Sequence, residues 1–103
     1  AQLCEQATVA APEVALGWYN LGIAERQRGH LPAATSAYRR ALALDPSYAE
    51  AQQNLAVALL LSGDIAGARE GFRQAIGLLS QQGRNQEAQA LHQQASTLVK
   101  LET

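Results

Sequence analysis

Two histidines, one cysteine and five serines are the side chains of this sequence best able to bind a metal, carry a proton or act as a nucleophile. Such chemistry needs defined spacings, because several groups must meet at one point. His30 and His92 are far apart, and the sequence has no His-x3-His pair, no Cys-x2-Cys pair and no carboxylate cluster. The serines lie outside any nucleophile-elbow pattern, and no glycine-rich phosphate loop is present. We therefore expect no metal, no cofactor and no catalysis from this chain.

The charge and hydropathy of the chain argue against two further classes of function. Eight Lys and Arg against nine Asp and Glu give a net charge of −1. There is no basic surplus to neutralise a phosphate backbone, so we expect no nucleic-acid partner. The longest apolar run, 55–61, is about a third of the length of a membrane span, so we expect no membrane insertion.

The beginning of the sequence has neither an initiator methionine nor a signal-peptide pattern. We expect a mature or excised soluble fragment, and both the cytoplasm and the periplasm stay open as its location. The single cysteine has no partner for an internal disulfide. Seven arginines against one lysine, with many Ala, Gln and Leu residues, would fit a bacterial source with a GC-rich genome.

Good helix formers dominate the composition, and glycine and proline divide the chain into segments of helix length. The breaks fall at Pro12, Gly29, Pro46, Gly63 and Gly83. Apolar residues recur every three or four positions in 14–28, 31–44, 48–61 and 65–80, which predicts amphipathic helices. Asp64 is the expected N-cap of the last of these. The short connections favour antiparallel hairpins, so the predicted fold class is all-α.

The segments between the breaks repeat. When the sequence is aligned with itself at an offset of 34 residues, identical or similar residues coincide at many positions. The matched pairs are Asn20 and Asn54, Leu21 and Leu55, Gly29 and Gly63, Ala34 and Ala68, Tyr38 and Phe72, and Ala41 and Ala75. The same shift places Cys4 on Tyr38, so we expect Cys4 to pack as a small apolar side chain. A constant offset at so many positions indicates a repeat architecture.

The residues that recur carry a resemblance to a known family. The stretch Trp18-Tyr19-Asn20-Leu21-Gly22, followed by Gly29, Ala34, Tyr38, Ala41 and Pro46, resembles a tetratricopeptide (TPR) repeat. The resemblance implies a right-handed α-solenoid of antiparallel helix pairs. It divides the chain into the second helix and turn of a truncated preceding repeat (1–14), one repeat (15–48) and a second repeat (49–82). In the second repeat Gln52, Ala56 and Ser80 replace the usual Trp, Gly and Pro.

Residues 83–103 form a separate C-terminal segment. Ala88, Leu91, Ala95, Leu98 and Val99 share one helical face, and glutamines and Lys100 occupy the other. This pattern predicts an amphipathic helix with Asn85 as a possible N-cap. The spacing of Gly83, Ala88, His92 and Ala95 echoes the second helix of a repeat, and His92 is the expected half-buried packing residue. We interpret the segment as a capping helix with a polar outer face.

The family resemblance also implies where a partner would bind. The first helix of each pair lines a concave groove for an extended or helical peptide. The groove positions of the family fall on Leu16, Tyr19, Asn20, Ile23, Arg26 and Gln27 in the first repeat, and on Glu50, Gln53, Asn54, Val57, Leu60 and Leu61 in the second. Apolar anchoring is expected from Tyr19, Ile23, Val57 and Leu60. The pair Arg39 and Arg40 lies on a second helix and is expected to be solvated.

The paired asparagines of the groove are its most informative residues. An amide donates and accepts hydrogen bonds at once, so Asn20 and Asn54 would hold a peptide backbone without reading its side chains. This resembles the asparagine ladder of peptide-binding members, although asparagine is also simply common at this position. The carboxylate-clamp variant of the groove fits poorly. It needs Lys and Asn where this chain has Tyr19 and Ile23, and then Gln53 and Val57.

These expectations converge on a non-catalytic protein–protein interaction module, an adaptor or scaffold that binds a protein or peptide in the groove. Two alternatives stay open. One is a structural segment that stacks on other repeats, or on a second copy through an N-terminal helix at 1–10. The other is a targeting appendage of a larger enzyme whose catalytic part lies elsewhere.

Overall fold

The computed structural model describes residues 11–99, and all the regular structure in that range is helical. Its elements are α2 (Ala11–Gln27), α3 (Leu31–Leu44), α4 (Ala49–Leu61), α5 (Ile65–Gln81) and α6 (Asn85–Val99). The expectations for residues 1–10, which are the packing of Cys4, the N-terminal helix and self-association through it, lie outside the described residues. The all-α prediction is confirmed.

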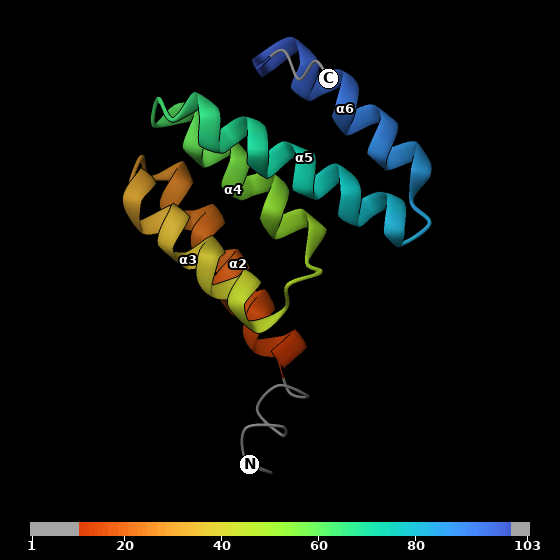
Figure 1. Ribbon diagram of the computed structural model, residues 1–103. Coiled ribbons are helices and arrows are strands. Elements are labelled where there is room, and N and C mark those ends of the chain that lie inside the picture. Colours follow the sequence, from red (N-terminus) through yellow and green to blue (C-terminus); the bar gives the residue numbers. More distant parts are fainter. Residues whose placement is uncertain (1–10, 100–103) are drawn as a thin grey trace.

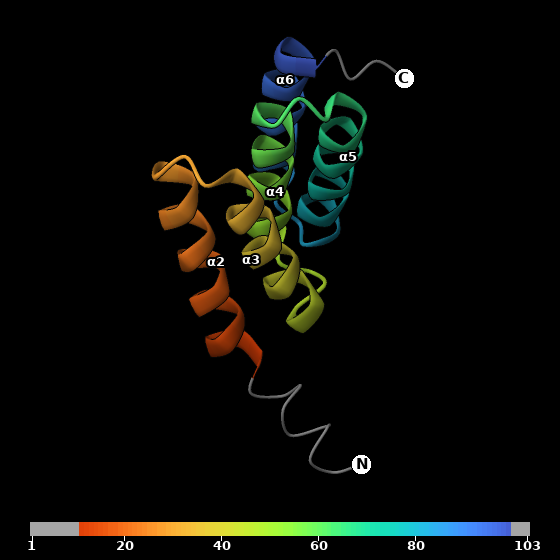
Figure 2. The same ribbon diagram turned by 90° about the vertical axis from the view of Figure 1, so that its left-hand side faces the viewer.

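The helices pack in chain order as antiparallel neighbours. Contacts join α2 to α3, α3 to α4, α4 to α5 and α5 to α6, and α2 also touches α4. Figure 1 shows the succession from α2 to α6 across the molecule. In Figure 2, α2 and α5 lie on opposite outer sides with α3 and α4 between them. This arrangement places the first helices of the two pairs, α2 and α4, in contact.

One turn geometry closes three of the hairpins. Gly29, Gly63 and Gly83 have φ values of 84°, 93° and 76°, which side chains other than glycine rarely adopt. After each glycine the next residue donates its N–H five residues back, as in Asp64 to Leu59 at 2.9 Å and Arg84 to Leu79 at 2.8 Å. The third of these turns joins α5 to α6. Helix α5 is therefore the second helix of one hairpin and the first helix of the next.

The helix ends follow from these turns. The residue after each glycine precedes the next helix, and its carbonyl accepts the first intrahelical bond, as in Ala88 to Arg84 at 2.9 Å. The Asp64 cap is confirmed, because its Oδ1 accepts from the Gly67 N–H at 2.9 Å. The Asn85 cap is wrong, since Asn85 is already the first residue of α6 and Arg84 holds the cap position. Helix α2 also begins at Ala11, before residue 14.

Two clusters of buried side chains form the core. One gathers Ala34 and Tyr38 of α3 with Leu55 and Ala58 of α4. The other joins α4, α5 and α6 around Phe72, with Ala88, Leu91 and Ala95 from α6. Tyr38 and Phe72 are the largest fully buried side chains, and most of their buried neighbours are alanines. Small residues therefore bring the helices close, and one ring per repeat fills the space between them.

The apolar stripe of α2 is not fully covered. Leu55 is only 6% exposed because α3 packs on it, but its repeat equivalent Leu21 is 43% exposed, and Val14 is 48% exposed. The helical pattern and the repeat offset place Leu21 and Leu55 at equivalent positions and predict that both are buried, and this prediction is wrong for Leu21. The reason is positional, since the described range contains no helix before α2 to play the role that α3 plays for α4.

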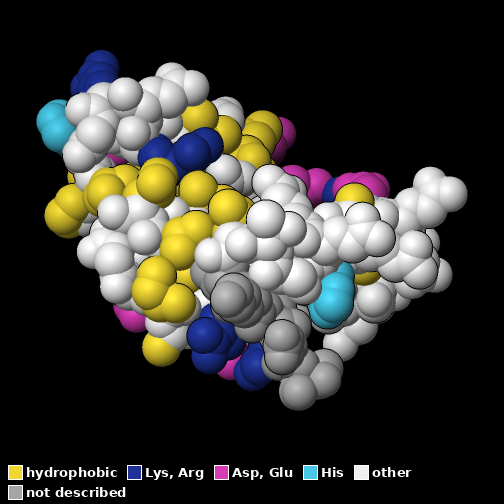
Figure 3. Space-filling view, turned by 90° about the horizontal axis from the view of Figure 1, so that it is seen from above, with side chains coloured by type: hydrophobic (Ala, Val, Ile, Leu, Met, Phe, Trp, Pro, Cys, Tyr) yellow, Lys and Arg dark blue, Asp and Glu magenta, His cyan; other side chains and the backbone are white. Residues whose placement is uncertain are grey.

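Helix α6 follows the expected amphipathic pattern except at Leu98 and His92, and the side chains of Val99 and Lys100 lie outside the description. Ala88, Leu91 and Ala95 are buried, while Leu98 is 47% exposed. The glutamines at 86, 89, 93 and 94 are exposed, and so is His92, which was expected to be half-buried. In Figure 3 the right-hand part of the surface, over α6, is mostly neither hydrophobic nor charged. A polar outer face of this kind is what the end of a helical solenoid needs.

Removal of the Tyr38 hydroxyl is expected to stabilise the chain. Tyr38 is 0% exposed, and its Oη has no hydrogen-bond partner in the described part of the chain. An unsatisfied buried hydroxyl costs about 1–3 kcal/mol, so Tyr38→Phe should raise the melting temperature by about 4–8 °C per kcal/mol recovered. Thermal unfolding followed by circular dichroism measures this. Tyr48→Phe is the control, and a Tyr38→Phe variant that melts below wild type would contradict the expectation.

Candidate functional site

The twelve predicted groove residues all lie on α2 and α4, and we call the surface they form the α2–α4 surface. Leu16, Asn20, Gln27 and Leu61 are exposed, and the other eight are half-buried. Tyr19 and Ile23 pack against the Tyr38 cluster, whereas Val57 and Leu60 pack against the cluster that α6 completes. The surface therefore has an apolar floor anchored in both cores.

A polar network joins the two helices across this surface. Asn54 Nδ2 donates to the Tyr19 hydroxyl at 3.0 Å and to the Glu50 carbonyl at 2.9 Å. Asn54 Oδ1 accepts from Arg26 Nη2 at a longer 3.4 Å. Both amide hydrogens of Asn54 are thus in use, and its oxygen has one acceptor position left. Asn54 is positioned to accept from a peptide N–H, but donation to a peptide carbonyl would require it to release a present bond.

Asn20 differs from Asn54 although the two occupy equivalent repeat positions. It is exposed, and its side chain makes no hydrogen bond to any residue within the described range. Its amide is therefore free both to donate and to accept. The structure thus distinguishes two asparagines that the repeat pattern treats alike: Asn20 faces solvent, and Asn54 links α4 to α2.

The tyrosine of this network, Tyr19, packs against two further tyrosines. The Tyr19 ring lies 5.0 Å from that of Tyr48 and 6.0 Å from that of Tyr38, between centroids, with both pairs tilted. Such tilted contacts are favourable arrangements for aromatic rings. Sequence reasoning did not include Tyr48 in the site, since it precedes α4 and lies outside the family positions. Its place directly after Pro46-Ser47 was the available signal, because a turn there points the chain back toward α2.

Burial first, and then the Glu50 carboxylate, raise the pKa of the Tyr19 hydroxyl. Burial followed by the neighbouring Tyr19 raises the pKa of Tyr48. Both hydroxyls therefore keep their protons at neutral pH and remain able to donate. The shifts move both tyrosine pKa values further from neutral pH, so they do not prepare either hydroxyl for acid–base catalysis there.

The raised pKa values predict a loss of stability in alkali. In the unfolded chain tyrosines ionise near pH 10, whereas Tyr19 and Tyr48 in the folded chain ionise at higher pH. Between these values the unfolded state binds fewer protons, so the free energy of unfolding falls as pH rises. Urea unfolding at a series of pH values from 8 upward, with about one-unit steps, measures the slope. Tyr19→Phe should make that slope shallower, and an unchanged slope would contradict the assignment.

An ion-pair cluster borders the surface where α6 begins. Arg84 Nη2 lies 2.6 Å from Glu50 and 2.7 Å from Glu87. Hydrogen bonds from Arg84 lower the pKa of Glu87, and both carboxylates raise the pKa of Arg84. Arg84 also donates to Gln82, which in turn donates to the Ser47 carbonyl at 2.7 Å. Sequence reasoning missed Arg84, although it stands 34 residues after Glu50 at the equivalent repeat position.

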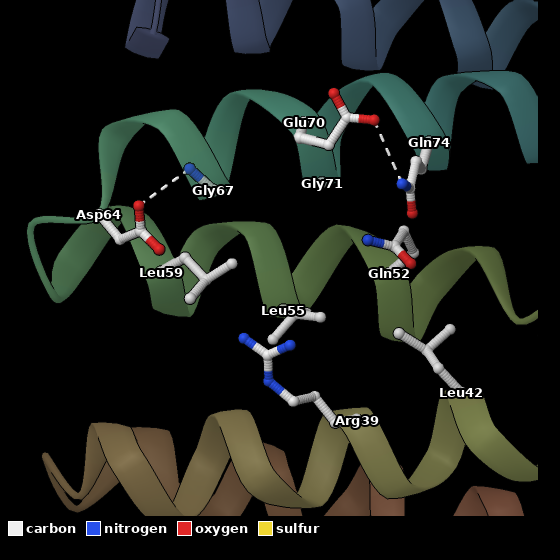
Figure 4. A pocket seen from close by; sticks show the side chains of 10 residues that line it. All are labelled: Arg39, Leu42, Gln52, Leu55, Leu59, Asp64, Gly67, Glu70, Gly71 and Gln74. Carbon is white, nitrogen blue, oxygen red and sulfur yellow. Dashed lines mark hydrogen bonds between the residues drawn. The ribbon is translucent and has the colours of Figure 1, made fainter.

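A cleft opens on a different face of α4 from the α2–α4 surface. It is a cleft of about 370 Å³ between α3 and α5, with α4 as its floor. Its lining consists of Arg39, Leu42, Gln52, Leu55, Leu59, Asp64, Gly67, Glu70, Gly71 and Gln74, shown in Figure 4. Gln52 occupies the repeat position of Trp18 and is much smaller than an indole. Arg39 and Arg40 are both exposed as expected, with Arg40 placed 5.2 Å over the Trp18 ring.

No group of three or more His, Cys, Asp or Glu side chains in the described range is arranged to hold a metal ion. Among the helices described, none has the length and apolar character needed to cross a membrane.

A comparison with known protein families identifies the segment that joins the helix pair α2–α3 to the pair α4–α5. Residues 22–63 match the profile of the family described as TPR repeat. This segment is a TPR repeat. It runs from Gly22 in α2, through α3 and α4, to the turn glycine Gly63, and so includes Asn54 and Arg26 of the α2–α4 surface. The resemblance read from the sequence is thus confirmed.

Two longer bacterial proteins are similar in sequence to part of this chain. Over 66 residues, 64% of the chain, it is 39% identical to the "Probable biofilm formation methyltransferase WspC" of Pseudomonas putida. It is 41% identical over an equal length to the protein of the same name from Pseudomonas aeruginosa. Each alignment spans only 16% of the relative, so the chain corresponds to about a sixth of those proteins.

Proposed function

We propose that this chain is a non-catalytic protein-interaction module that binds a peptide or helix on the α2–α4 surface. The observation that carries the proposal is the composition of that surface. Half-buried apolar side chains such as Ile23 and Val57 lie beside polar groups fixed by the Tyr19–Asn54–Arg26 network. TPR repeats typically mediate protein binding, which supports the same interpretation.

Binding on this surface divides into two contributions. Tyr19, Ile23, Val57 and Leu60 offer partly covered apolar area, which a partner's side chains would remove from water. Asn20 offers a free amide, and Asn54 offers one acceptor. Because the aromatic and polar groups are already held by neighbours, little conformational entropy is lost when a partner binds.

Peptide selection tests the proposal without a known partner. A library of random peptides displayed on phage is selected against the chain, and the enriched peptides are synthesised and titrated by fluorescence anisotropy. The Asn20→Ala/Asn54→Ala double variant should bind them more weakly. Arg39→Ala/Arg40→Ala, on the α3 side, is the matched control and should bind as wild type does. Circular dichroism spectra of both variants must first match that of wild type, which establishes that the substitutions leave the helices intact. Equal binding by all three proteins, or no enriched peptide, would contradict the proposal.

A second candidate function rests on the relatives. Both are named as methyltransferases and are about six times longer than the matched region. We propose as the alternative that the module is an appendage that brings a larger enzyme to its protein partner. The gene that encodes the chain provides the test. A methyltransferase domain in the same reading frame supports the alternative, and a frame without a catalytic domain contradicts it.

The structural alternative, in which repeats stack on other repeats, has its own signature. The exposed Val14 and Leu21 lie on the uncovered side of α2. Sedimentation velocity at rising concentration, with a Leu21→Ser variant for comparison, measures association through this side. Association lost in Leu21→Ser, together with failure of the peptide selection, would replace the peptide-binding proposal with a stacking role.

A further inference from the structure

Arg26 is a half-buried cation that forms no ion pair with any of the residues 11–99. Its Nε is buried and has no hydrogen-bond partner in the described part of the chain. Its Nη2 makes one long bond, of 3.4 Å, to the neutral amide of Asn54. A guanidinium carries five donors, so most of its bonding capacity is unused. Partial burial of an unpaired charge costs free energy, which makes this arrangement unusual for a purely structural residue.

Two carboxylates on the same two helices are engaged elsewhere. Glu25, the neighbour of Arg26 in α2, lies 2.8 Å from the ring of His30. Glu50, on the facing helix, is held by Arg84 at 2.6 Å. Within the described range no Asp or Glu oxygen comes within 4.0 Å of Arg26. Both of these acids therefore contact other side chains, and neither forms an ion pair with Arg26.

Tyr19 adds a second donor beside the same amide. Its oxygen accepts from Asn54, and its own hydrogen is not used in any hydrogen bond within the described range. Asn54 touches both Tyr19 and Arg26, so it fixes the phenol and the guanidinium on the two sides of one amide. The raised pKa of Tyr19 keeps this hydroxyl protonated. Two positioned donors, one of them cationic, suit a carboxylate.

We propose that Arg26 and Tyr19 together bind the carboxylate of an Asp or Glu side chain within the partner peptide. This inference rests on the proposed function and specifies its partner. A phosphate group would bring about two negative charges and calls for a cluster of arginines, whereas Arg26 is a single cation here. Exposed apolar groups lie on both sides of the pair, at Leu16 and at Leu61. A peptide that continues in both directions uses both, which favours an internal side chain over a terminal carboxylate.

The enriched peptides from the phage selection are the probes. They are synthesised with acetylated and amidated ends, so that only side chains carry charge. The expected result is one shared acidic position, and replacement of that Asp or Glu by its amide should weaken binding by about ten- to a hundredfold. Arg26→Gln should weaken binding by a similar factor. Arg28→Gln, an exposed arginine two positions along α2, is the control and should bind as wild type does.

Two further variants separate recognition from structural support. Arg26→Glu should prefer a peptide whose acidic residue is replaced by lysine, which reverses the charges of the pair. Arg26→Gln should unfold at the same or a higher urea concentration than wild type, because it removes a half-buried charge that has no counter-ion. Destabilisation by Arg26→Gln would show a structural role and overturn the inference.

The outcomes also separate this inference from the proposed function. Enriched peptides that bind the α2–α4 surface without a shared acidic residue would overturn the inference alone. Peptides that need a free terminal carboxylate would overturn it as well. If Asn20→Ala/Asn54→Ala leaves binding intact, the proposed function fails first, and the role given to Arg26 and Tyr19 fails with it.

Discussion

Phe72→Ala is expected to lower the free energy of unfolding by about 3–5 kcal/mol. The Phe72 side chain is 1% exposed and lies in the cluster that joins α4, α5 and α6. Its loss removes the largest apolar group of that cluster, and its neighbours Ala56, Ala68 and Ala88 are too small to fill the cavity. Such truncations cost about 3–5 kcal/mol. Small domains have about 5–15 kcal/mol in total, so this one change removes much of the stability.

Urea unfolding followed by the helical circular dichroism signal measures the effect. Leu61→Ala is the matched control, because Leu61 lies on α4 but is 58% exposed. Its free energy of unfolding should stay within about 0.5 kcal/mol of wild type. A Phe72→Ala variant with the wild-type midpoint would show that α6 does not depend on this cluster.

Gly22→Val is expected to produce the second largest loss. A Cβ atom at Gly22 would lie 2.5 Å from Cε1 of Tyr38 and 2.7 Å from Cδ1. Tyr38 is completely buried and has no room to withdraw, so the branched side chain would force α2 away from α3. Overpacking of this kind costs about 1–3 kcal/mol, and more where backbones must separate.

Gly17→Val is the control for this prediction, since it makes the same change in the same helix. Nothing lies within 4 Å of a Cβ atom at Gly17. Valine there should leave stability unchanged or slightly improve it, because glycine is a poor helix former. Equal melting temperatures for Gly22→Val and Gly17→Val would refute the close contact between Gly22 and the Tyr38 ring.

Local patterns were sufficient to predict the helices and their turns. Gly29, Gly63 and Gly83 end helices at the expected places because a positive φ is required there, and that requirement is visible in one residue. The same holds for the Asp64 cap. The extra length of α5 was less obvious. It has 17 residues against 14 in α3, because Ser80 stands where Pro46 stops the earlier helix.

The sequence predicted which residues lie on the α2–α4 surface, but it did not predict their hydrogen bonds, because these depend on contacts between helices. The repeat offset correctly placed Tyr19, Asn20 and Asn54 on one pair of helices. It treated Asn20 and Asn54 as equivalent, whereas Asn54 is bonded to Tyr19 and Asn20 is free. Likewise Leu21 and Leu55 share a repeat position but differ in burial. Of their two helices, α2 and α4, only α4 follows another helix in the described range.

The isolation of Arg26 could not be seen in the sequence at all. Glu25 precedes it along the chain and Glu50 lies on the facing helix, and nothing in the sequence indicates that both acids contact other residues. The structure assigns these acids to His30 and Arg84 instead. That Arg26 meets no carboxylate in the described part of the chain is a property of the whole arrangement, and side-chain reach across helices decides it.

The strictly sequential packing of α2 to α6 also determines how the chain reaches its fold. Nearly every contact joins helices adjacent in the sequence, so folding has no long loop to close. Chains with such local contacts fold in about microseconds to milliseconds. The hairpins α2–α3 and α4–α5 are able to form independently and in either order, so synthesis on the ribosome need not be complete before the first pair assembles.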